Sequence, residues 1–418
     1  MKTTVIFFSL LSFLFLSNKS FSQGEAAVWF LTFPVSPSQN AMGYTGTSLP
    51  IDDPYGFLLN PAQLGYTSQQ NNFSYIFYPS KVKLWDFDEI RIKGSAINIG
   101  YNFKELLGFP ISLGLGYTNQ KLELKYNFFP FENAQDEQKY NAYSLGVGVD
   151  YYLEFNAGVT YKNINSSITS PIFDSTLTTY EAKGNSWDFG FLINLPLLKL
   201  IDDKITFNIL NKKPLKPFVN ISFGYSQSNI GDEIYYVDPA QKDPLPRTAR
   251  LGYGISSGVD IQFDDKPLKF IGMDFTVDAE DLLLKYKTDP GIFFPVTRFD
   301  GYQSFIGDIN IGRNILQVKG DENVITHAGV QLNFLESFLL KFGQMKGRSD
   351  NNRSTNGFEI RSSGLLKFLS SVTNSSVVRF ISNHFDVRYY NSNYKAASDL
   401  KTNIKGIAFY VHNLDSLF

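Results

Sequence analysis

The sequence predicts an all-β fold, namely a transmembrane antiparallel β-barrel of about 14 strands with an N-terminal hatch segment in its lumen. Three observations support this prediction. They are a secretory signal at the N-terminus, a proline-rich apolar segment after it, and long runs of alternating apolar and polar residues in the rest of the chain. They divide the chain into a signal peptide (1–22), a hatch or plug segment (23–71) and a barrel (72–418).

The first 22 residues have the layout of a secretory signal peptide. Met1-Lys2 gives a positive start, Thr3 to Leu16 is almost entirely apolar, and Ser20-Phe21-Ser22 places small residues where a signal peptidase reads them. The apolar stretch is shorter than the roughly 20 residues that span a bilayer, so cleavage before Gln23 is favoured over the alternative, a retained anchor. The chain has no Cys, which excludes a cysteine-linked lipid and disulfides.

Composition favours a membrane barrel among exported proteins. Aromatic residues make up 16% of the chain, with 39 Phe and 24 Tyr against 4 Met, and membrane barrels use such residues for their interfacial girdles. After the signal, no apolar stretch is long enough for a transmembrane helix. The 38 basic and 40 acidic residues give a net charge of −2, so the basic surface of a nucleic-acid-binding protein is missing.

Period-two alternation predicts the strands. In Tyr143 to Tyr151, for example, Tyr, Leu and Val alternate with Ser, Gly and Asp, as in a strand with one apolar face. Several runs cover about 9–11 residues, enough to cross a bilayer, and their apolar faces often end in Tyr, as at Tyr101, Tyr117 and Tyr161. A soluble two-sheet sandwich is the alternative, because alternation does not distinguish lipid from a protein core.

Glycines recur on the face opposite the apolar one. Because glycine weakens a strand, this repetition indicates either curvature of the sheet or something packed close to the wall. The glycines are Gly114, Gly116, Gly146, Gly148, Gly158, Gly224, Gly252, Gly254 and Gly272.

The segment from Gly24 to Tyr66 is the candidate hatch. Its five prolines disfavour interior strand positions, yet it is too rich in apolar residues for a solvated tail. A segment of this kind requires burial without regular strand pairing, which the lumen of a barrel provides.

Within that segment, Phe30 to Gly65 resembles the N-terminal signature of the PorV/PorQ outer-membrane proteins. Three parts carry the resemblance: Ala41-Met42-Gly43, Asp52-Asp53-Pro54 and Asn60-Pro61-Ala62. The order of elements in the C-terminal third, from His327 onward, is similar as well.

The resemblance implies a FadL-like barrel of fourteen strands in the bacterial outer membrane, with Asp52, Asp53, Asn60, Pro61 and Ala62 as its hatch motif. It also implies a role in type IX protein secretion, with the translocon or its cargo as protein partners beside outer-membrane lipid. The alternative function is a FadL-like channel for long-chain fatty acids or other hydrophobic small molecules. The position after Ala62 departs from the signature, because it is not glycine, and it fits either a PorV-like or a PorQ-like branch.

Two aromatic loop patches are candidate partner or ligand contacts. Phe128, Phe129 and Phe131 form one, and Phe293 and Phe294 form the other. Interfacial anchoring in the membrane is the alternative interpretation of both patches.

The sequence does not favour an enzyme. Gly254 to Gly258 matches the G-x-S-x-G pattern but lies inside an alternating strand, whereas a nucleophile elbow requires a strand-to-helix turn. The three His residues lie in separate segments without metal-ligand spacing, so we expect no catalytic residue, metal site or cofactor.

Overall fold

The computed structural model describes residues 26–84, 89–128, 131–170, 178–202, 205–210, 213–240, 242–263, 266–289, 296–347, 352–373, 375–395 and 401–417. The predicted signal peptide lies outside these residues.

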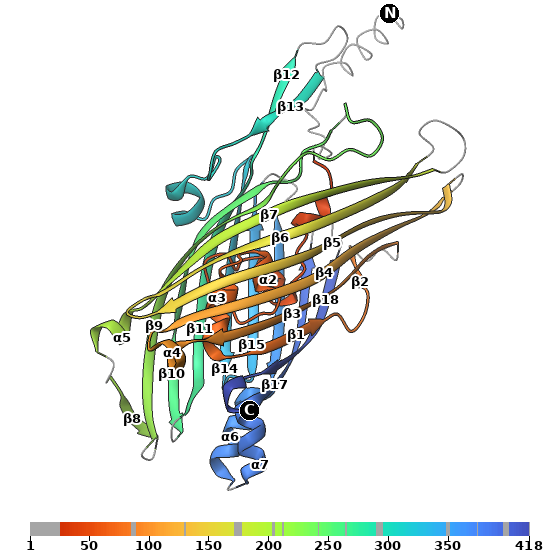
Figure 1. Ribbon diagram of the computed structural model, residues 1–418. Helices are drawn as coiled ribbons and strands as arrows, with labels where there is room; N and C mark the ends of the chain where they lie inside the picture. Colours follow the sequence, from red (N-terminus) through yellow and green to blue (C-terminus); the bar gives the residue numbers. More distant parts are fainter. Residues whose placement is uncertain are drawn as a thin grey trace, which may run out of the picture.

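Fourteen strands of the described chain form one closed antiparallel ring (Figure 1). Neighbouring ring strands are hydrogen-bonded, and the first of them, β1, closes the ring by pairing with β18 on one side and β3 on the other. The ring strands are β1 (Phe73–Phe77), β3 (Ile90–Asn102), β4 (Ile111–Phe128), β5 (Phe131–Asp150), β6 (Glu154–Ser170), β7 (Thr178–Pro196), β9 (Lys213–Gly231), β10 (Thr248–Phe263), β11 (Lys266–Leu282), β14 (Val324–Phe334), β15 (Phe338–Lys346), β16 (Arg353–Arg361), β17 (Phe385–Lys395) and β18 (Lys401–Val411). The predicted all-β barrel of 14 strands is confirmed.

Shorter elements decorate the two ends of the ring. The end that carries the β12–β13 hairpin is called the upper end, and the end that carries α6 and α7 is called the lower end (Figure 1). These elements are β2 (Val82–Lys83), α4 (Lys104–Leu107), α5 (Leu197–Ile201), β8 (Phe207–Leu210), β12 (Leu284–Asp289), β13 (Val296–Tyr302), η5 (Ile311–Leu316), α6 (Ser362–Val372), α7 (Ser376–His384) and η7 (Leu414–Ser416).

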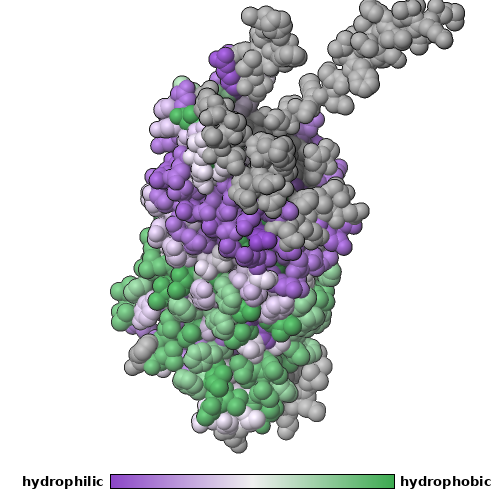
Figure 2. All heavy atoms as spheres, turned by 90° about the vertical axis from the view of Figure 1, so that its right-hand side faces the viewer, coloured by the Kyte–Doolittle hydropathy of each residue, from purple (hydrophilic) through white to green (hydrophobic). Residues whose placement is uncertain are grey.

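An aromatic row marks the upper edge of the apolar outer surface. Tyr117, Tyr143, Tyr161 and Trp187 face one another across β4, β5, β6 and β7, with ring centroids 5.2 Å apart for Tyr117–Tyr143 and 5.0 Å apart for Tyr161–Trp187. Toward the lower end, the outward side chains of these strands are apolar and exposed; Leu115, for example, is 52% exposed. Figure 2 shows this apolar surface over the lower half of the molecule and a hydrophilic surface over the upper half.

A row of asparagines follows the aromatic row on the same four strands. Asn119, Asn141, Asn163 and Asn185 occupy the next outward positions, and Asn119 Nδ2 donates to Asn141 Oδ1 at 2.7 Å. Amide side chains bond to one another and to water, which fixes the boundary between lipid and solvent at this row.

The two faces of the wall exchange their polarity at this boundary. Above the asparagine row the outer face carries charges, such as Lys121 bound to Glu137 at 2.6 Å. The inner face, which is small or polar within the belt, instead presents apolar side chains such as Leu122, Tyr140 and Ile164. The upper lumen is therefore apolar inside a water-facing wall.

A closed ring with an apolar outer belt satisfies every requirement for crossing a bilayer, because its strands pair with neighbours on both sides. The protein is an outer-membrane β-barrel of the bacterial cell. No helix in the described residues is long and apolar enough to cross a membrane. Three residues join β5 to β6 and β14 to β15 at the lower end, whereas 41 residues join β11 to β14 at the upper end. Since such barrels turn tightly on the periplasmic side and extend on the outside, we assign the lower end, which also carries the α6–α7 connection, to the periplasm.

Replacing Leu113 by Arg tests the position of the belt. Leu113 is an outward residue between the aromatic row and the lower end of β4, so an arginine there should cost about 2–4 kcal/mol of unfolding free energy in lipid. Asn119→Arg on the same strand is the matched control, with a cost of about 0–1 kcal/mol. Equal costs in urea unfolding would contradict the assignment of the belt.

Candidate functional site

Residues 26–72, here called the N-terminal segment, lie inside the ring (Figure 1). The segment is made of short helices and turns, and Gln70 is its only exposed residue. Ser36 caps one of these helices, because its side chain accepts from the Gln39 N–H at 3.0 Å and Pro37 supplies the fixed φ of the first helical position. The elements are η1 (Trp29–Thr32), α2 (Pro37–Ala41), η2 (Gly56–Leu58), α3 (Gln63–Thr67) and η3 (Ser68–Gln70).

Glycines of the wall allow the backbone of the segment to approach closely. A Cβ at Gly158 would lie 2.3 Å from the Pro61 carbonyl oxygen, and one at Gly343 would lie 2.0 Å from the Gly43 nitrogen. Eleven of the fourteen ring strands meet the described segment through glycines, which are Gly100, Gly114, Gly116, Gly146, Gly148, Gly158, Gly190, Gly224, Gly254, Gly329, Gly343, Gly357 and Gly406.

These contacts decide between the two explanations of the glycine face. Seven of the nine glycines singled out in the sequence lie against the segment, as expected for something packed close to the wall. Gly252 and Gly272 do not, since their nearest neighbours belong to the wall itself. The contacts on β14, β15 and β16 were missed, although Gly329, Gly343 and Gly357 alternate with apolar residues in the same way.

The structure brings Asn60, Pro61 and Ala62 together against β6 and β7. Asn60 Nδ2 donates to the Thr47 carbonyl at 2.7 Å and to the Phe191 carbonyl of the wall at 3.0 Å, while its Oδ1 accepts from the Ala62 N–H. Pro61 and Ala62 pass over Gly158. The motif therefore links a turn of the segment to the wall.

Gln63 takes part in the same packing. Its amide nitrogen donates to the carbonyls of Gly46 and Leu49 at 2.9 and 2.7 Å, and its Oε1 accepts from the Ile51 N–H at 3.0 Å. The residue that departs from the family signature thus holds the loop between Gly46 and Ile51.

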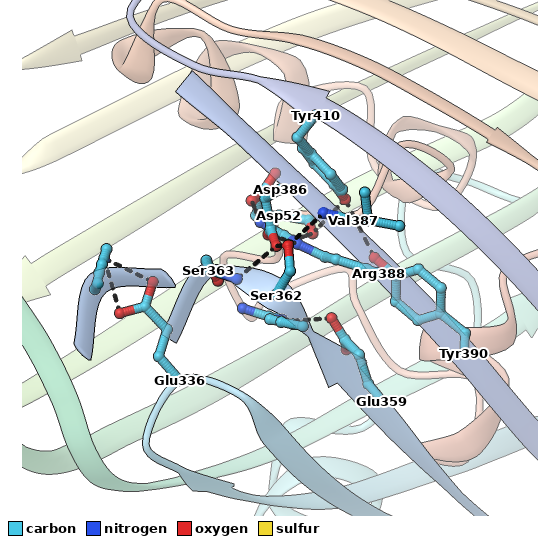
Figure 3. A network of polar contacts seen from close by, with 12 residues as sticks. Asp52, Glu336, Glu359, Ser362, Ser363, Asp386, Val387, Arg388, Tyr390 and Tyr410 are labelled. Atoms are coloured by element: carbon cyan, nitrogen blue, oxygen red, sulfur yellow. Dashed lines mark hydrogen bonds and ion pairs between the residues drawn. The ribbon is translucent and has the colours of Figure 1, made fainter. Parts of the chain in front are cut away.

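Asp52 and Asp53 are adjacent but have different partners. Arg388 of β17 donates to the Asp52 carboxylate at 2.6 Å and to the Asp52 carbonyl at 2.9 Å (Figure 3). Asp53 is buried and accepts from Ser36 and from the Tyr55 N–H. Burial raises the pKa of Asp53 above its ordinary value, and the two hydrogen bonds counteract that rise by favouring the ionised form.

Further polar and charged residues of the wall hold the loop around Gly43 to Ser48. Asp278 of β11 accepts from the N–H groups of Gly46 and Thr47 at 2.9 and 3.0 Å and from the Ser48 hydroxyl at 2.7 Å. Arg250 donates to the Tyr44 carbonyl at 2.9 Å, and His327 bonds to the Gly43 carbonyl at 2.8 Å. These anchors were not identified from the sequence, where an inward charge resembles any polar residue of an alternating strand.

A second part of the segment, residues 26–33, is held in another way. Ala27, Val28, Phe30 and Leu31 pack into an apolar cluster in the upper lumen, called the upper apolar cluster. Its remaining members are Val82, Leu84, Ile92, Tyr140, Ala142, Ile164, Ala182, Ile234, Leu245 and Ile404. The Phe30 ring lies 5.6 Å from the Tyr140 ring and 6.1 Å from the Phe33 ring.

On the periplasmic side of the segment lies a polar cavity of about 560 Å³, called the vestibule. Its lining includes Asp52 from the segment and Asp260, Lys269, Arg361 and Lys367 from the ring and its lower end. The lumen thus has a packed apolar upper part and a polar cavity below it.

The aromatic loop patches lie largely outside the described residues. Phe128 ends β4 and Phe131 begins β5, where they pair at a hairpin tip; of the other residues, Phe129, Phe293 and Phe294 are outside the described chain. The role of these patches stays a prediction.

The pattern from Gly254 to Gly258 lies within β10, without a strand-to-helix turn. No group of three or more His, Asp or Glu residues in the described chain could hold a metal ion.

No family model matches the chain, and no curated protein matches it. The chain is similar to the CymD monoaromatic hydrocarbon channel, with 10% identity, 90% of this chain and 97% of that chain covered, and a TM-score of 0.43. A Pseudomonas aeruginosa FadL homologue has 9% identity, the same coverage and a TM-score of 0.35. The translocator domain of the autotransporter NalP from Neisseria meningitidis has 11% identity, 83% and 89% coverage and a TM-score of 0.37.

The similar structures thus include a channel as well as a translocator domain. The likeness to the PorV/PorQ family remains a resemblance of sequence.

Gly158→Ala tests the contact between segment and wall. The added methyl group would collide with the Pro61 carbonyl, so overpacking should cost about 1–3 kcal/mol of unfolding free energy and increase amide exchange at Ala62. Gly272→Ala is the matched control, because its Cβ meets only the flexible Lys269 side chain at 3.0 Å and Asn333. If both variants behaved alike, the close approach would not constrain the barrel.

Proposed function

We propose that this protein is a non-enzymatic outer-membrane channel for hydrophobic small molecules, with residues 26–33 as a displaceable plug. The observation that carries the proposal is the apolar upper lumen, which lies above the lipid belt and is filled by the beginning of the described chain. Residues 36–68 form the floor beneath the plug in this proposal, and they stay in place when the plug is displaced.

The position of the upper apolar cluster supports a ligand site. At this height the outer face of the wall is in water and carries ion pairs such as Lys93 with Glu123. The apolar residues are on the inner face, so contact with lipid does not explain them. Inward apolar side chains line the upper lumen, and the buried Lys162–Asp188 ion pair lies beside Tyr140 of this lining. An apolar lining with a few polar groups is usual for a site that binds a hydrophobic molecule. The upper lumen lies at the outer end of the barrel, where such a molecule would enter.

The different tethers of the two parts support the idea that only the first part is displaced. Hydrogen bonds described between residues 26–33 and other segments are those of the Ala27 N–H with the Pro244 carbonyl, the Phe30 N–H with Gln138 and the Phe33 carbonyl with Tyr44. The floor is held instead by buried charges such as Arg388 and Asp278. A hydrophobic molecule could therefore replace the apolar contacts of Phe30 and Leu31 at a small cost in hydrogen bonds.

Association with a type IX secretion translocon or its cargo is a separate prediction, which rests on the resemblance alone. A contact that favours it over the channel is not found in the described part of the chain.

A variant that lacks residues 26–33 after signal cleavage tests the channel. Removing the plug vacates the place of the Phe30 side chain, whose burial contributes about 1.5–3 kcal/mol. A ligand would no longer compete with this side chain, so the affinity for radiolabelled palmitate should rise about tenfold or more. Phe30→Ser should raise it in the same direction. Retention of palmitate by the purified barrel in nanodiscs is the measurement.

Leu316→Ser is the matched control, because Leu316 is 70% exposed and lies outside the upper apolar cluster. Its palmitate binding should equal that of the unaltered barrel. Equal retention by all four proteins, with normal heat-modifiable migration in gels, would reject the channel.

A further inference from the structure

Two helices at the periplasmic end form a hairpin that the channel proposal does not use. α6 and α7 lie between β16 and β17 and pack against each other, with residue 374 between them outside the described chain. The hairpin hangs from the lower rim of the ring (Figure 1).

Each helix carries an apolar stripe at helical spacing. In α6 the residues follow the i, i+3, i+4, i+7 pattern, and in α7 they follow i, i+3, i+4, so each set lies on one face. All seven side chains are between 37% and 64% exposed. They are Leu365, Phe368, Leu369, Val372, Val377, Phe380 and Ile381.

The opposite, polar side of the hairpin faces the vestibule. Ser363 and Lys367 of α6 and Ser382 and Asn383 of α7 belong to the lining of that cavity. Glu336, in the turn between β14 and β15, holds Lys367 there, with 2.7 Å between the Glu336 Oε1 and the Lys367 Nζ. The apolar stripes therefore point away from the lumen.

Hydrogen bonds to β17 fix this orientation. The Asp386 carboxylate accepts from the Ser362 hydroxyl at 3.0 Å and from the Ser363 N–H at 2.8 Å, and the Ser362 hydroxyl in turn accepts from the Val387 N–H (Figure 3). The first turn of α6 is thus attached to the neighbouring strand, so the hairpin is not free to rotate its apolar side inward.

The apolar stripes continue the lipid-facing surface of the ring. The outward residues next to the hairpin, Ile360 of β16 and Phe385 and Val387 of β17, are apolar and 48%, 41% and 45% exposed. Figure 2 shows the hydrophobic surface continuing to the lower end of the molecule.

Charge is consistent with a lipid surface as the occupant. Residues 362–384 contain no Asp or Glu; Lys367 is bound to Glu336, and the other basic side chain, Arg379, is exposed. An amphipathic helix with apolar residues on one side and basic residues among its polar ones is typical of elements that lie in the boundary between headgroups and acyl chains.

We propose that the α6–α7 hairpin inserts its apolar stripes into the periplasmic leaflet of the outer membrane and thereby forms a wall between lipid and the vestibule.

Because the chain has no Cys, single cysteines can be labelled with a nitroxide without background. Phe368→Cys and Phe380→Cys report on the hairpin, and Leu113→Cys is the reference for lipid. Lys139→Cys is the reference for water, because Lys139 lies on the outer face above the asparagine row and its side chain is 44% exposed. The barrel is placed in vesicles of phosphatidylethanolamine and phosphatidylglycerol with no other protein, and folding is checked by heat-modifiable migration. Collisions with oxygen and with a water-soluble nickel chelate are then measured by electron paramagnetic resonance.

Both hairpin labels should resemble the Leu113 label, with high access to oxygen and low access to nickel. Access to nickel equal to that at Lys139 would overturn the proposal, because the stripes would then face water instead of lipid. Low access to both reagents would overturn it as well, since the stripes would be packed inside the protein. Two label sites keep the test valid if one variant fails to fold.

Discussion

The close approach of the N-terminal segment to the wall glycines is the contact on which the other features of the lumen depend. A ring of this size leaves more space than inward side chains fill, and the segment fills it with helices and turns. Contacts such as Gly43 with Gly343 bring backbone beside backbone, away from water. The N–H and C=O groups of the segment then require partners, because an unpaired buried group costs about 1–3 kcal/mol. Inward charges such as Asp278 and Arg388 supply those partners.

The same requirement explains why the two parts of the segment differ. At the level of the lipid belt, the turns of the segment leave many backbone N–H and C=O groups without partners within the segment. The inner wall is polar there, and its side chains bond to these groups. Above the asparagine row the wall has exchanged its faces, and Phe30 and Leu31 need only apolar neighbours. A buried charge without its partner is far more costly than an apolar contact replaced by another, so displacement is confined to residues 26–33.

The sequence predicted what depends on local periodicity and missed what depends on long-range contacts. Alternation and Tyr at the ends of runs predicted the ring and its aromatic row, since both follow from one strand at a time. Ion pairs such as Lys341 with Glu359, 2.7 Å apart, join residues of different strands. In the sequence, each of these residues looks like any other polar residue on the inner face of an alternating strand. The helical spacing of Leu365, Phe368 and Leu369 was a signal that could have found α6, but the segment was not separated from the strands on either side.

One carboxylate connects the floor to the hairpin. Asp386 accepts from Ser362 and Ser363 at the start of α6 and from Arg388 at 2.7 Å, and Arg388 holds Asp52 of the segment. The Arg388 guanidinium also lies 3.7 Å from the centre of the Tyr410 ring, whose hydroxyl donates to the Asp52 carbonyl. Moving the hairpin away from β17 would leave a buried carboxylate short of two donors, and moving the floor would leave a buried guanidinium unpaired. Because Asp386 and Arg388 bind both elements, the hairpin and the floor are coupled at the periplasmic end and move together, whereas residues 26–33 at the outer end can be displaced alone.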